Sequence, residues 1–234
     1  MPSAGSRSRT LLLPAPPAAG RDNTIATDST FRRLLGEAGW RRLNPNVRAR
    51  FAVKPDAGQV FAFTGVMDVV RRSWFGWLVG QVCRLIGTPV TPRQGRDVPT
   101  VVHIYRSSRG DGIVWERRYG FSGRAPVVVS STKRVDLFAG LLECASRGFA
   151  MRLRLFERDG AIHFASTGYC LEVGRWRLPI PHLLTPGDAH VVHSDEGNGW
   201  FRFTMSFRHR LFGETYFQEG LFHQAEATPN RRQP

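Results

Sequence analysis

From about residue 98 to the end of the chain, apolar and polar residues alternate in short segments. Residues 200–208 show the pattern clearly, since Phe201, Phe203, Met205 and Phe207 alternate with polar residues such as Arg202. This spacing predicts a β-strand whose aromatic face points inward and whose other face meets water. Short glycine-containing turns separate such segments, as in hairpins. The pattern predicts about nine strands, at 60–70, 98–106, 113–121, 126–135, 149–155, 162–173, 190–194, 200–208 and 211–222.

Helical spacing is confined to the N-terminal part of the chain. Phe31, Leu34, Leu35 and Ala38 follow a run of residues suited to N-caps at 28–30, and Gly39 is the expected end of this helix. After it, residues 45–51 are expected to form a second short turn, before the first strand.

Residues 74–87 predict a second helix with two different faces. Large side chains form one face, which comprises Trp74, Leu78, Val82, Leu85 and Ile86, and small residues form a seam, which comprises Gly76, Gly80, Cys83 and Gly87. The glycines lower intrinsic helicity by roughly 1 kcal/mol each relative to alanine, so the helix needs a surface to lie against. We expect its large side chains to be buried against the sheet. The alternative is contact with a membrane, in which Arg71, Arg72 and Arg84 would meet anionic head groups.

The fold class that follows is mainly β (α+β): a curled antiparallel sheet or barrel-like meander with two N-terminal helices. Crossover helices between strands are missing, which argues against a parallel α/β fold, and a sheet of many antiparallel strands avoids exposed edges by curling on itself. We expect one β-rich domain at 28–226. The Ser-, Pro-, Gly- and Arg-rich segment 1–27 and residues 227–234 are expected to be disordered.

The net charge of +14 raises the question of a nucleic-acid partner. Of the 33 basic residues only Lys54 and Lys133 are lysines, and the arginines are scattered rather than gathered in a stripe or a known module. We therefore interpret the charge as a solvated positive surface and expect no nucleic-acid partner. It still favours weak contact with acidic partners or anionic membranes.

Three scattered cysteines form neither a disulfide framework nor a metal-ligand spacing, and the apolar run at 11–13 is too short for an export signal. These features favour a cytoplasmic protein. We expect no metal and no cofactor, because no G-x-G-x-x-G motif follows a predicted strand and the histidines lack a chelating pattern. His190 and His193, for example, should point to opposite faces of one strand.

Several segments resemble an uncharacterised bacterial family, a domain of unknown function (forty-one sixty-six). They are 31–36, 40, 43–45, 47–48 and 51, then 84–89, 115–117, 142–143, 178–181, 209–213 and 218–222, of which His209-Arg-Leu-Phe-Gly213 with 218–222 is the most telling. The resemblance spans about 31–223. It implies a protein that stands alone or follows reductases similar to saccharopine dehydrogenase, and it implies no catalytic residues.

The candidate chemical group is Glu116 with Tyr105 and His103. A plausible hairpin register sets Glu116 near Tyr105 and His103, and a carboxylate inside a barrel pocket could act as a general base. The simpler interpretation is an ion pair between Glu116 and an arginine such as Arg106 or Arg118.

Three functional hypotheses remain open. The leading one is a module that binds a lipophilic small molecule in a β-barrel-like pocket, because 16 phenylalanines and 6 tryptophans are more than a single curling sheet needs. The second is an enzyme that uses Glu116, Tyr105 and His103 in that pocket. The third is an interaction module for a separately encoded reductase.

Overall fold

The computed structural model describes residues 26–27, 30–86, 90–108, 110, 112–137 and 139–225. The two tails expected to be disordered lie outside this part of the chain, apart from Ala26–Thr27. These two residues form strand β1, which pairs antiparallel with β2 (Val53–Lys54).

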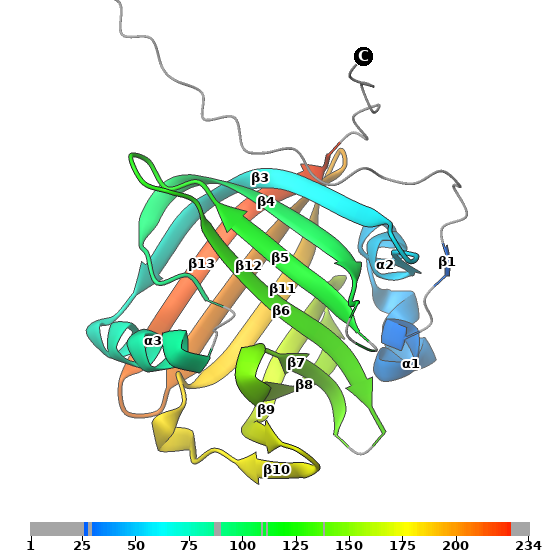
Figure 1. The fold of residues 1–234 in the computed structure, drawn as a ribbon. Coiled ribbons are helices and arrows are strands. Elements are labelled where there is room, and N and C mark those ends of the chain that lie inside the picture. Colours follow the sequence, from blue (N-terminus) through cyan, green and yellow to red (C-terminus); the bar gives the residue numbers. More distant parts are fainter. Residues whose placement is uncertain are drawn as a thin grey trace, which may run out of the picture.

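A closed antiparallel barrel forms the body of the protein (Figure 1). The strands follow the order β9-β11-β12-β13-β3-β4-β5-β6-β7-β8, and pairing of β8 with β9 closes the ring, while β10 pairs with β9 alone. Their bounds are β3 (Val60–Arg72), β4 (Gly95–Arg106), β5 (Ile113–Tyr119), β6 (Val127–Asp136), β7 (Gly140–Cys144), β8 (Phe149–Arg158), β9 (Ala161–Val173), β10 (Trp176–Pro179), β11 (Asp188–Gly197), β12 (Trp200–His209) and β13 (Gly213–Gln224).

The predicted fold class is confirmed, and all nine predicted strands are present. Phe201, Phe203, Met205 and Phe207 are buried in the barrel, as the alternation predicted. Two strands of the large sheet were missed for opposite reasons. Strand β7 is buried on consecutive positions, so it shows no alternation, and every residue of β10 is exposed.

Helices α1 (Thr30–Arg42) and α2 (Pro45–Phe51) lie at one end of the barrel (Figure 1). The predicted end of the first helix at Gly39 is wrong: helical residues continue to Arg42, and the break falls at Gly36, whose positive φ of 70° suits glycine. The predicted turn at 45–51 is a helix capped by the Asn44 side chain. Its Phe51 is buried against inward-facing Trp115 and Phe164, so α2 plugs this end of the barrel.

Helix α3 (Trp74–Ile86) lies at the opposite end of the barrel (Figure 1). In the chain it connects β3 to β4. Here the expected burial of the large side chains is wrong for Trp74, Trp77 and Leu78, which are exposed. The reason is the glycine seam. Gly76 sits so close to the carbonyl oxygen of Thr215 that a Cβ atom would lie 1.9 Å from it. The helix therefore packs on the barrel through Gly76 and the neighbouring Phe75, which is buried, and its tryptophans point toward solvent.

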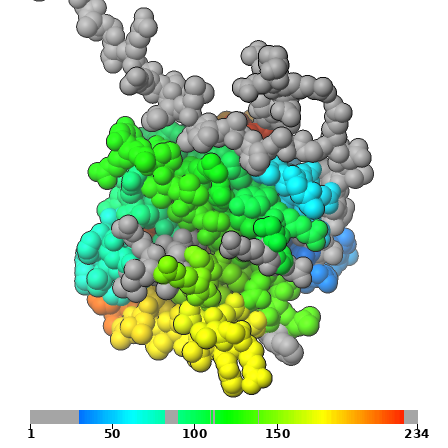
Figure 2. Space-filling model, in the orientation of Figure 1, coloured from blue at the N-terminus to red at the C-terminus, as the bar shows by residue number. Residues whose placement is uncertain are grey.

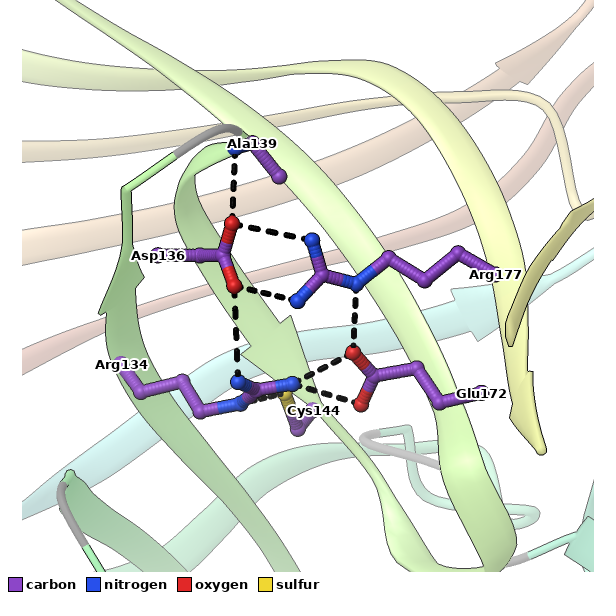
Figure 3. Close-up of polar contacts among 6 residues, drawn as sticks. All are labelled: Arg134, Asp136, Ala139, Cys144, Glu172 and Arg177. Carbon is purple, nitrogen blue, oxygen red and sulfur yellow. Dashed lines mark hydrogen bonds and ion pairs between the residues drawn. The ribbon is translucent and has the colours of Figure 1, made fainter. Parts of the chain in front are cut away.

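An ionic network ties three strands together on the outside of the barrel (Figure 3). Arg134 of β6 donates to both oxygens of Glu172 on β9, at 2.5 and 2.6 Å. Arg177 of β10 bridges Glu172 and Asp136: its Nε donates to Glu172 at 3.0 Å, and its two terminal nitrogens donate to the two oxygens of Asp136, one of them at 2.9 Å. The alternating charges hold the β9–β10 hairpin against β6. This contact lies near the β8–β9 pairing that closes the barrel.

Candidate functional site

A cavity of about 440 Å³ opens inside the barrel at the end covered by α1 and α2. Its walls come from both helices and from the inward faces of strands β3 to β7. Most of the lining is aromatic or aliphatic, including Phe31, Phe61, Ile113, Val135 and Leu141. A space of this size, with an apolar lining and a few polar groups, is typical of small-molecule sites.

Side chains fill the other half of the interior. Tyr119 and Tyr216 both donate to the carbonyl oxygen of the Gln218 side chain, at 3.1 and 2.9 Å, and all three residues are buried. Beneath α3 a space of only about 40 Å³ remains. The barrel thus has an open cavity at its α1–α2 end and a packed core at its α3 end.

A buried ion pair divides these two halves. The Lys133 amine, which lines the cavity, lies 3.2 Å from Glu143, which lines the small space under α3. Burial by itself raises the pKa of Glu143, but Lys133, Arg117 and the Ser131 hydroxyl, which donates at 2.7 Å, hold the pKa below its usual range. Burial lowers the pKa of Lys133, and Glu143 opposes that shift.

Further polar groups surround this pair at the inner end of the cavity. The ammonium of Lys133 lies 4.7 Å from the centre of the Trp115 ring, and Arg117 is nearly fully buried beside Phe203. His193 packs among aromatic rings, and burial, with Arg50, Lys133 and Arg117 nearby, holds its pKa well below the usual value. His193 is therefore neutral at pH 7.

The structure brings the sequence-predicted residues His103, Tyr105 and Glu116 together, on the outer face of the barrel. His103 is paired with Glu116 across β4 and β5, and their neighbours Ile104 and Trp115 line the cavity. Because adjacent residues of a strand face opposite sides, His103 and Glu116 point away from the interior. Tyr105 donates to Glu116 across 3.4 Å from the same outer face.

The carboxylate of Glu116 is engaged there by an arginine. Arg118 donates to it at 2.7 Å, whereas the nearest His103 nitrogen is 3.7 Å away. Burial and the positive charge of Arg118 lower the pKa of His103, and burial and Glu116 raise the pKa of Tyr105. At neutral pH this arrangement is an ion pair covered by an uncharged histidine and tyrosine, and none of its residues lines the cavity.

A family model described as "Domain of unknown function (DUF4166)" matches residues 43–222. That match spans the three charged groups described above and all the barrel strands apart from the last two residues of β13. The chain belongs to this family. No curated protein and no solved structure is significantly similar to it.

The charged residues inside this DUF4166 barrel, Arg117, Lys133 and Glu143, were missed by sequence reasoning. Three features of the sequence could have indicated them. Arg117 shares the period-two face of Trp115, so an inward tryptophan implies an inward arginine. Glu143 follows two leucines in a short apolar segment, and Lys133 is one of two lysines in an arginine-rich chain.

Proposed function

We propose that the barrel binds a lipophilic small molecule in the cavity beneath α1 and α2. The observation that carries this proposal is the cavity itself: about 440 Å³ stays open at one end of a barrel whose other end is packed. The volume falls within the range of roughly 300–1,000 Å³ found for ligand sites. Its aromatic and aliphatic walls favour a ligand that gains free energy by leaving water.

A matched pair of valines on β6 tests this proposal. Val135 lines the cavity, whereas Val128 points outward from the same strand, so Val135→Trp should fill the cavity and Val128→Trp should not. We expect Val135→Trp to weaken binding of the neutral fluorescent probe N-phenylnaphthylamine about tenfold or more, since a bound ring and the new indole compete for one space. Native mass spectrometry of the purified protein should show the same difference for any co-purified ligand. Equal binding by both variants would place the probe elsewhere.

A second candidate function, contact with an anionic lipid surface, is favoured by the outer side of the α3 end. Apart from Gln81 and Arg84, α3 is made of apolar residues and glycines, and a helix that is apolar all round needs cover on every side. In the first two turns of the helix the barrel covers Phe75 and Gly76, and it leaves Trp74, Trp77 and Leu78 exposed. Trp74 is 69% exposed, and Leu184 and Leu211 on neighbouring turns are 71% and 72% exposed.

These exposed residues come from elements that lie together. Trp74 packs edge-on against Phe212 of the β12–β13 turn, with ring centres 5.6 Å apart. In Figure 2 helix α3, this turn and the segment from β10 to β11 adjoin one another at the lower left of the molecule. Exposed Arg210 directly precedes Leu211 of the patch, and its positive charge suits anionic head groups. Among the described residues, no helix has both the length and the hydrophobicity to cross a membrane.

Co-sedimentation with vesicles tests this second candidate. We expect binding to phosphatidylcholine vesicles that contain phosphatidylglycerol, weaker binding at high salt, and little binding to phosphatidylcholine alone. The double variant Leu184→Gln/Leu211→Gln should lower the partition constant about a hundredfold, because each leucine loses roughly 1.5 kcal/mol of apolar transfer. The control Val128→Gln removes an exposed apolar residue outside the patch. Equal binding by all three proteins would contradict lipid contact, and a dimer in gel filtration that the double variant abolishes would assign the patch to a second copy instead.

A further inference from the structure

The side chains around the cavity are unusually one-sided in charge. Among the described residues, five lysines and arginines line it and no aspartate or glutamate does. The five are Arg50, Lys54, Arg106, Lys133 and Arg134. Arg134 is bound by Glu172 on the outside, but both lysines of the chain, Lys54 and Lys133, belong to the set. The cavity therefore has mostly apolar walls, and all the charged side chains that line it are positive.

Hydrogen-bonding groups at the inner end of the cavity lack partners. The Nη1 atoms of Arg50 and Arg117, Nε1 of Trp115 and Nδ1 of His193 are all buried and have no hydrogen-bond partner among the described residues. An unmet buried donor costs about 1–3 kcal/mol, and more when it is charged. Trp115 lines both the cavity and a small adjoining space that Arg117 and His193 also line. Arg50 lines the cavity and lies over the ring of Phe201, which lines the small space, so the four groups lie where the two spaces adjoin.

The charges at this inner end do not balance. Arg50, Arg117 and Lys133 are cations, and burial, partly opposed by Asp195, lowers the pKa of Arg50 to about 10, which leaves it charged at pH 7. The carboxylates that act on them are Glu143 and Asp195, while His193 is neutral. Three positive charges against two negative ones leave a single positive charge in excess.

We propose that the ligand of this cavity is an amphiphile with one negative charge, of the class of long-chain carboxylic acids. Its carboxylate lies at the inner end, where it accepts hydrogen bonds from Arg50, Arg117 and Trp115 after small rotations of these side chains. Its hydrocarbon chain follows the aromatic and aliphatic walls toward α1. This inference rests on the proposed function and adds the chemistry of the head group to it. One carboxylate supplies both the missing acceptors and the missing charge.

Calorimetry with dodecanoate and dodecanol, which share a chain and differ in charge, tests the head group. The wild-type protein should bind dodecanoate about tenfold or more tightly than dodecanol, since hydrogen bonds to a charged group are the strong ones. Arg50→Met should remove most of that difference and leave the affinity for dodecanol within about twofold. Arg48→Met is the matched control, because Arg48 is on the same helix and does not line the cavity, and it should leave both affinities unchanged.

The possible results separate the two proposals. Equal affinity of the wild-type protein for both probes would overturn the anionic head group and leave the lipophilic site standing. Binding of neither probe would overturn the lipophilic site itself. If dodecanoate is preferred but Arg50→Met and Arg48→Met behave alike, the assigned place of the carboxylate is wrong. Circular dichroism checks that each variant is folded, and Arg117→Met, measured in the same way, replaces Arg50→Met if that variant does not fold.

Discussion

Replacing Lys133 by methionine should lower the free energy of unfolding by about 3 kcal/mol. The amine is 3.2 Å from Glu143, and both side chains are buried. Without Lys133 the carboxylate stays in the barrel without its closest countercharge, and breaking such a buried pair costs about 3–5 kcal/mol. We expect the lower end of this range, because Arg117 also acts on the charge of Glu143. Denaturant unfolding followed by tryptophan fluorescence measures the loss.

The double variant Lys133→Met/Glu143→Gln controls for the change in shape. It removes both charges, and the amide oxygen of glutamine can still accept the hydrogen bond that Ser131 donates to Glu143. A neutral pair of similar volume often replaces a buried ion pair at little cost, so the double variant should recover most of the lost stability. If single and double variants are equally unstable, packing by the lysine stem and not the stranded carboxylate explains the loss.

Acidification below pH 6.5 should lower the free energy of unfolding steeply. This loss should begin at a pH well above the range in which carboxylates titrate. Burial is the main cause that lowers the pKa values of His103, His163, His190 and His193 in the folded protein. The unfolded chain takes up protons on these residues near pH 6.5, and the folded protein resists doing so. Stability is therefore complete above pH 6.5 and falls as the pH drops toward the folded pKa values, by up to about 1.4 kcal/mol per pH unit for each histidine.

His193→Phe isolates the largest of these contributions. Phenylalanine suits the site, because Phe51, Phe164 and Phe203 surround the imidazole. Between pH 7 and pH 5 the variant should lose about 2 kcal/mol less than the wild-type protein, which is the full linkage contribution of one histidine that stays neutral when folded. Unfolding free energies at several pH values give both curves. Parallel curves would mean that His193 takes up its proton in the folded barrel.

Much of the barrel could be predicted from local pattern. Alternation located nine strands, and the register that placed Glu116 near His103 is the register of the structure. The inner face of β12 was also predicted, because one of its faces is wholly apolar and the other is polar. Prediction failed for strands whose two faces do not differ in burial: the central residues of β7 are buried on both faces, and the residues of β10 are exposed on both.

The sequence by itself determined that the chain forms a mainly antiparallel sheet, since period-two patterning is a property of neighbouring residues. Only the tertiary structure decided which face of β5 is inside, because both faces carry arginine: Arg117 points inward and Arg118 outward. For the same reason the sequence placed Glu116 inside the barrel, although it lies on the outer face, and did not predict that Lys133, Glu143, Arg117 and His193 are buried together. These residues come together because closure of the barrel joins strands that are far apart in the chain. A local sequence pattern does not specify which distant charged residues will be buried next to each other.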